Sequence, residues 1–142
     1  MIEKNLCCQS VLVVEDDEDI RTAMVDILES EGYTTESATN GQEALELLHK
    51  IHKPCLVLLD MMMPIMNGRE FLDKIMEDTY LAPIPVLVVS AGADKADTEG
   101  AVGFLKKPVD IDMVMKMVKR YCSGAFTDVG VRPGEEAQSP RL

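Results

Sequence analysis

Hydrophobic and polar positions along this chain alternate between short apolar runs and longer amphipathic segments. Runs rich in Val and Leu occupy residues 11–14, 55–59 and 86–89, and a further run follows at 101–106. Short runs of this kind are typical of buried parallel strands. Residues 33–38 are more polar and favour an edge strand. The pattern therefore predicts five strands.

Four segments between and after these runs show the spacing of amphipathic helices, at residues 18–30, 42–50, 69–77 and 110–122. Turn signals precede or follow them, among them Asn40-Gly41. The faces predicted to point inward carry Ile20, Met24, Ile27, Leu28, Ala44, Leu45, Leu48, Phe71, Leu72, Ile75, Ile111, Val114, Met115, Val118 and Cys122.

Strands that alternate with helices predict an α/β fold, with a doubly wound parallel sheet covered on both faces. A chain of 142 residues fits one domain with a substantial core. We expect that domain at residues 10–122, after an N-terminal extension at 1–9. Residues 123–142 contain Gly, Pro, Ser and acidic residues without periodicity, which predicts a disordered tail.

Composition narrows the functional classes. The net charge is −11, so we expect neither nucleic acid nor an anionic membrane surface as a partner. The chain has no apolar run long enough to span a bilayer and no signal peptide at its start, which predicts a cytoplasmic protein. The four cysteines show no CxxC pattern, and we expect reduced thiols without a catalytic role.

Charged and polar residues follow several of the predicted strands. Glu15 and Asp16 follow the first, Asp60 the third, Ser90 the fourth and Lys107 the fifth. Parallel strands with right-handed crossovers end at the same edge of a sheet, where doubly wound folds bind ligands. The sequence therefore predicts that these side chains meet in one pocket.

The chemistry of that pocket suits a divalent cation and a phosphoryl group. Crowded carboxylates repel one another unless a cation screens them, and oxygen ligands favour Mg²⁺, with Mn²⁺ as an alternative. Lys107 supplies a point charge for phosphate and Ser90 a hydroxyl donor. A carboxylate can itself accept a phosphoryl group, and Asp60 is the best candidate because it stands between the metal-binding acids and the lysine.

With these residues in place, the chain resembles the receiver domains of two-component response regulators, including the single-domain, chemotaxis-type proteins. The resemblance covers residues 10–122. It implies a flavodoxin-like sheet with the strand order 2-1-3-4-5. The matching segments are residues 11–17, 59–64, 67–68, 85–91 and 103–108.

The resemblance implies a role for each site residue. Asp60 would be phosphorylated by a histidine kinase or a histidine phosphotransfer protein. Asp16 would bind Mg²⁺ directly and Glu15 through water. Met62 would bind the metal through its backbone carbonyl, and Lys107 would pair with the phosphoryl group. Ser90 would move its hydroxyl toward the phosphate, and Phe104 would act as an aromatic switch.

The chain departs from the family pattern in the segment at 91–100. This segment is short, and its two glycines and three acids favour only a shortened or irregular helix between the fourth and fifth strands. In addition, Asp17 offers a third acid and Lys106 a second lysine, although the register favours Asp16 and Lys107.

The resulting hypothesis is a phosphoacceptor signalling domain rather than an enzyme with its own substrate. It would switch a protein–protein surface toward an unknown downstream partner, or relay phosphate. Two alternatives stay open: an aspartate-nucleophile phosphatase of the haloacid dehalogenase type, suggested by Asp17-Glu18-Asp19, and an interaction module that takes no phosphate. The sequence also leaves open a monomer or a phosphorylation-dependent homodimer.

Overall fold

A computed structural model describes residues 10–91 and 98–122 of the chain. Its centre is a parallel sheet in the order β2-β1-β3-β4-β5, which confirms the predicted fold class and strand order. The first crossover adds β2 on one side of β1, and the chain then returns to build β3, β4 and β5 on the other side. The strands are β1 (Ser10–Val14), β2 (Thr34–Ala38), β3 (Leu56–Leu59), β4 (Val86–Ser90) and β5 (Gly103–Lys106).

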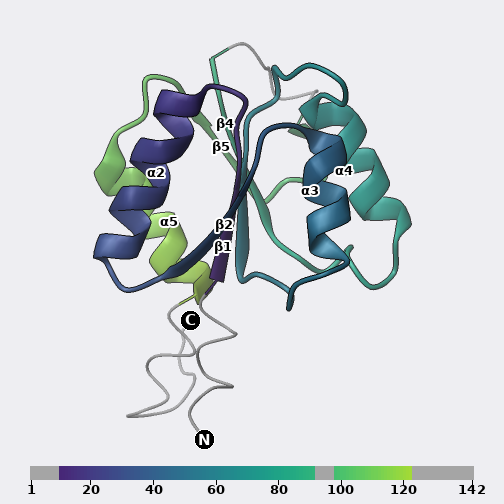
Figure 1. Cartoon of the computed structure of the whole chain (residues 1–142), viewed down its shortest axis with the longest axis horizontal. Helices are drawn as coiled ribbons and strands as arrows, with labels where there is room; N and C mark the ends of the chain where they lie inside the picture. Colours follow the sequence, from purple (N-terminus) through teal and green to yellow (C-terminus); the bar gives the residue numbers. More distant parts are fainter. Residues whose placement is uncertain (1–9, 92–97, 123–142) are drawn as a thin grey trace, which may run out of the picture.

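Helices cover both faces of the sheet (Figure 1). The α2 and α5 helices lie on one face, and α3 and α4 lie on the other. The helices are α2 (Glu18–Ser30), α3 (Gly41–Leu48), α4 (Gly68–Glu77) and α5 (Ile111–Cys122).

Each face of the sheet has its own core. Alternate residues of a strand point to opposite faces, so β1 sends Val11 and Val13 toward α2 and α5, and Leu12 and Val14 toward α3 and α4. Every residue of β1, β3 and β4 is buried, as the apolar runs predicted. In β2 only Ala38 is buried, in keeping with the predicted edge strand.

The predicted helix faces are confirmed in their centres and differ at their ends. Met24, Leu28 and Val114 are buried, and so is the predicted apolar face of α4, which consists of Phe71, Leu72 and Ile75. In contrast, Ile20 is 38% exposed and Ile111 is 37% exposed, because both lie in the first turn of a helix that begins beyond the edge of the sheet. The prediction that these two side chains belong to the core is therefore wrong.

Three other predictions concern segments that lie wholly or partly outside the described residues. Residues 92–97 fall outside the described residues, and so the short or irregular helix at 91–100 stays a prediction. The same holds for the extension at 1–9 and for the tail at 123–142. Within the described part of the chain, no helix has the length and apolar character needed to cross a membrane.

The cysteines differ from expectation. Cys55, just before β3, and Cys122, the last residue of α5, form a disulfide with a Cα–Cα distance of 5.3 Å. The prediction of reduced thiols is therefore wrong for this pair. Its cause is the topology, which places the end of α5 against the start of β3 although 67 positions separate the two cysteines.

Candidate functional site

Three carboxylates gather at the carboxyl edge of the sheet. Val14 of β1 is paired with Leu59 of β3, so the residues that follow these two strands leave the sheet side by side. Oxygen atoms of Glu15, Asp16 and Asp60 all lie within 4.8 Å of one another. Glu15 and Asp60 are each only 5% exposed, whereas Asp16 faces solvent. The predicted acidic site is thus assembled, with one carboxylate at its open side.

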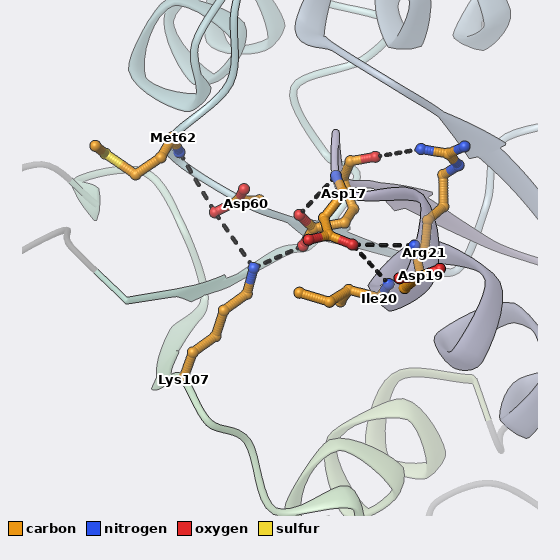
Figure 2. A network of polar contacts seen from close by, with 8 residues as sticks. Asp17, Asp19, Ile20, Arg21, Asp60, Met62 and Lys107 are labelled. Atoms are coloured by element: carbon orange, nitrogen blue, oxygen red, sulfur yellow. Dashed lines mark hydrogen bonds and ion pairs between the residues drawn. The ribbon is translucent and has the colours of Figure 1, made fainter.

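Lys107 brings the positive charge to this site (Figure 2). Its Nζ donates a hydrogen bond to Oε1 of Glu15 at 2.7 Å and lies 3.8 Å from Oδ1 of Asp60. The backbone N–H of Lys107 donates to the carbonyl of Ser90, which ties the residue to the end of β4. The peptide bond between Lys107 and Pro108 is cis. The lysine therefore lies against both buried carboxylates, nearer to Glu15 than to Asp60, and its single charge offsets one of their two negative charges.

The environment of Glu15 makes its charge costly. Burial is the largest influence and raises the pKa of the Glu15 carboxyl above its usual value, while the hydrogen bond from Lys107 opposes this rise. The nearby charge of Asp60 raises the pKa further. A divalent cation among these oxygens would favour the ionised form, and oxygen-only donors are those that Mg²⁺ prefers. The donor set therefore fits such an ion.

Asp17, the third acid after β1, has a different task. Its side chain accepts hydrogen bonds from the backbone N–H groups of Asp19 and Ile20, and so it is the N-cap of α2 (Figure 2). The acids that gather with Asp60 are Glu15 and Asp16, as the favoured register predicted, while Asp17 is engaged at the start of α2.

Arg21 was not singled out from the sequence, yet it helps to hold the site. Its Nη1 donates to the backbone carbonyl of Glu15 at 2.9 Å, from one turn into α2. The backbone N–H of Asp17 donates to Oε2 of Glu15 at 3.2 Å. Glu15 is thus fixed through both its backbone and its side chain. The spacing of six residues between Arg21 and Glu15 carries no helical or strand signal from which this contact could be predicted.

The loop between β3 and α4 shapes the other side of Asp60. The backbone N–H of Met62 donates to Oδ1 of Asp60 at 3.3 Å, while the Met62 side chain is 63% exposed. This contact is made by the N–H group, and the metal-binding role of the Met62 backbone carbonyl stays a prediction. Farther along, Met66 N–H donates to the carbonyl of Pro64, which makes a γ-turn with Ile65 at φ 68°.

Gly68 lets this loop close on Asp60. A Cβ atom at Gly68 would lie 2.7 Å from Cα of Met61 and 3.0 Å from the carbonyl oxygen of Asp60. The N–H of Gly68 also donates to the carbonyl of Met61. The close approach of backbone to backbone is a reason for glycine at this position, independent of its turn signal.

Ser90 and Phe104 lie at the margin of the site. Ser90 ends β4 and is fully buried. Phe104 of β5 is partly buried and packs against the core on the α3 and α4 face. The predicted motions of these two residues are not described by a single structure, and their switching roles remain proposals.

A cavity of about 460 Å³ adjoins the buried carboxylates. Glu15, Asp60 and Lys107 contribute to its wall, but nearly all of the remaining wall is apolar. This surface explains why burial dominates the pKa of Glu15. The main apolar contributors are Val13, Ile20, Met24, Leu58, Val89 and Val109.

Comparison with known proteins agrees with this geometry. The family model described as the response regulator receiver domain matches residues 11–119. The polar-differentiation response regulators DivK of Brucella anthropi and Brucella ovis are each 34% identical over 122 residues, which cover 82% of this chain and 98% of theirs. The chain therefore belongs to the response regulator receiver domain family, a family of signalling domains.

Solved structures support the same assignment. A response regulator receiver protein from Pseudomonas putida has a TM-score of 0.74 and 30% identity, and the match covers 78% of this chain and 95% of that one. The response regulator TrrA from Thermotoga maritima, solved in complex with Mg²⁺-BeF, has a TM-score of 0.71 and 27% identity, with coverage of 80% and 98%. Both share the fold of this chain.

Proposed function

We propose that this protein accepts a phosphoryl group on Asp60 in a Mg²⁺-dependent reaction, with a histidine kinase or a histidine phosphotransfer protein as donor. The single observation that carries the proposal is the position of Asp60. It is a buried carboxylate, within 4.8 Å of two other acids and 3.8 Å from the ammonium of Lys107. The complex of the relative TrrA with Mg²⁺-BeF supports the choice of metal and of a phosphoryl-like ligand.

In this reaction a carboxylate oxygen of Asp60 attacks the phosphorus atom of the phosphohistidine. The new O–P bond forms as the N–P bond breaks, and the imidazole leaves with its electron pair and takes up a proton. Mg²⁺, held by Asp16 and Asp60, by Glu15 through water and by the backbone carbonyl of Met62, would neutralise charge on the phosphoryl oxygens. Mn²⁺ would serve in the same way.

Residues of the chain itself position the Asp60 carboxyl group for the reaction. The backbone N–H of Met62 and the ammonium of Lys107 both contact Oδ1 of Asp60 and hold its carboxyl group in one orientation. Once a phosphoryl group is attached, Lys107 would move its charge from Glu15 to the new oxygens. The Ser90 hydroxyl would then move toward the phosphoryl group, and the Phe104 ring would turn inward into the space that Ser90 leaves.

The outcome of this change is a remodelled protein surface near β5 and α5. That surface would bind a downstream protein, a histidine phosphotransfer protein in a relay, or a second copy of this chain. Histidine kinases phosphorylate their partners on the cytoplasmic side, and we place the protein in the cytoplasm for that reason. Autodephosphorylation by water would be the only hydrolysis.

The test is the intact mass after incubation with acetyl phosphate, with Mg²⁺ and with a chelator. We expect one added phosphoryl group, only with Mg²⁺, and none in Asp60→Asn. Asp26→Asn, on the exposed side of α2, is the matched control and should be phosphorylated like the natural chain. Asp16→Asn should need more Mg²⁺ for the same yield, because it removes a ligand.

A short-lived adduct would escape this measurement, and a thermal shift with beryllofluoride covers that case. Beryllofluoride with Mg²⁺ should raise the melting temperature of the natural chain and of Asp26→Asn, but not that of Asp60→Asn. If neither an adduct nor a Mg²⁺-dependent thermal shift is found in folded protein, the phosphoacceptor proposal is wrong. The chain would then be an interaction module on the receiver fold.

A further inference from the structure

The disulfide between Cys55 and Cys122 lies far from the phosphoacceptor chemistry and has no part in it. Cys55 precedes β3, whose other end leads to Asp60. Cys122 ends α5, whose other end follows Lys107. The bond therefore closes a covalent ring that contains both the acceptor and its lysine, at the edge of the sheet opposite to the site.

The α5 helix packs on the sheet through one stripe of side chains. Its buried residues are Val114, Val118 and Cys122, while its other side chains are half-buried or exposed. The neighbouring strand β5 has no fully buried residue. At the start of α5 the chain is held by the ion pair of Lys107 with Glu15, and at its end by the disulfide. Of the described helices, α5 is thus the one whose packing a covalent bond supplements.

We propose that Cys55 and Cys122 form a reversible thiol–disulfide pair that fixes the end of α5 on β3, so that the redox state of the surroundings sets the stability of α5. The Cα–Cα distance of 5.3 Å lies within the range that a disulfide spans without movement of the backbone. Cytoplasmic disulfides are uncommon and, when present, are usually transient or redox-sensing. The proposal concerns this pair alone and does not depend on phosphorylation of Asp60.

The two cysteines differ in a way that fits reversible exchange. Cys122 is only 1% exposed, whereas Cys55 is half-buried. An external thiolate would therefore attack Sγ of Cys55, form a mixed disulfide there and release Cys122 as a thiolate. A second thiolate would release Cys55. Reduction in this way consumes two external thiols and yields one external disulfide, such as oxidised glutathione, and oxidation is the same exchange in reverse.

The effect on stability follows from the length of the closed loop. The bond joins residues 67 positions apart, and a link of that span restricts the unfolded chain strongly. For a domain of this size we expect reduction to lower the melting temperature by on the order of 10 °C. The lower global stability should speed hydrogen exchange throughout the core, and local opening should add the largest increase where the bond is attached, in α5.

The experiment uses the full chain with Cys7→Ser and Cys8→Ser, so that only the proposed pair remains. The protein is equilibrated in oxidised and reduced glutathione, treated with N-ethylmaleimide under denaturing conditions and weighed. In the oxidised buffer we expect no adducts and a linked peptide containing both cysteines. In the reduced buffer we expect two adducts, a lower melting temperature and faster hydrogen exchange, with a larger increase in α5 than in β1.

Cys55→Ala and Cys122→Ala in the same background are the matched controls, and the melting temperature of neither should respond to glutathione. Once the Cys55–Cys122 pair is reduced, the melting temperature of the protein should equal that of the two variants, apart from a small loss of packing in Cys122→Ala. Two adducts in the oxidised buffer, or a bond between two copies of the chain, would overturn the proposal. So would a linked pair whose reduction leaves both the melting temperature and α5 exchange unchanged.

Discussion

Removing the ammonium group of Lys107 should destabilise the protein, because two buried carboxylates then lose the positive charge beside them. Lys107→Met keeps the length of the side chain but loses the 2.7 Å contact with Glu15 and the 3.8 Å contact with Asp60. At an effective dielectric constant of about 20, these contacts correspond to gross attractions of about 6 and 4 kcal/mol. Most of this is offset by the desolvation of the three groups.

The net loss can be bounded from the burial of the pair. Breaking a buried ion pair by removal of one partner costs about 3–5 kcal/mol. The Lys107 side chain is 18% exposed, and solvent screens part of the interaction. We therefore expect Lys107→Met to lower the free energy of unfolding by about 2–3 kcal/mol at pH 8 without Mg²⁺.

The loss should depend on pH, because Glu15 loses the contact that holds its pKa down. The pKa of Glu15 in the folded protein is already raised by burial, and it should rise further in Lys107→Met. A folded carboxyl with a raised pKa binds protons more tightly than the unfolded one. Stability is therefore gained as the pH falls through the folded pKa, and the deficit of the variant should be smaller at pH 5 than at pH 8.

The assay is urea unfolding at pH 5 and pH 8, each with and without Mg²⁺, followed by circular dichroism because the chain has no Trp. Lys106→Met is the control, since Lys106, the last residue of β5, directly precedes Lys107 and is exposed. It should change the free energy of unfolding little. Saturating Mg²⁺ should restore part of the loss in Lys107→Met. A loss that is equal in both variants, or that ignores pH and Mg²⁺, would refute this account of the site.

Substitutions at three further positions test local features. Gly68→Ala places a Cβ 2.7 Å from Cα of Met61 and should lower the free energy of unfolding in urea by about 1–3 kcal/mol, and it should also reduce phosphorylation. No change in stability would mean that the loop can move to make room for the Cβ. Ile65→Gly should leave stability unchanged or raise it by up to about 1 kcal/mol, because Ile65 has φ 68°, and a clear loss would show that its side chain contributes packing. Asp17→Ala should cost about 1 kcal/mol and Asp17→Asn much less, as expected for an N-cap; equal losses would contradict that role.

The parts of this protein that the sequence predicts are those governed by short-range pattern and by strand topology. Buried strands such as residues 11–14 need apolar side chains on both faces, and this is visible as a continuous run. Once the strands are parallel, chain direction alone brings Asp16, Asp60 and Lys107 to one edge. No side-chain detail is needed for that step.

The parts that it misses depend on the orientation of single side chains. The resemblance implied that Lys107 pairs with a phosphoryl group, but the sequence does not indicate its 2.7 Å contact with Glu15. Ile20 fits the apolar stripe of its helix but extends past the sheet. The pairing of Cys55 with Cys122 follows from where α5 ends on the sheet, and no spacing rule contains that information.

The central claim is that Asp60 itself takes the phosphoryl group with the help of a metal held by its acidic neighbours. The most direct test is reduction of the acetyl phosphate-treated protein with borohydride, which converts an aspartyl phosphate to homoserine, followed by peptide sequencing in a mass spectrometer. The account predicts homoserine at position 60 alone, and only when Mg²⁺ was present. Conversion at Asp16 or Asp17 instead, or conversion at Asp60 that a chelator does not prevent, would contradict it.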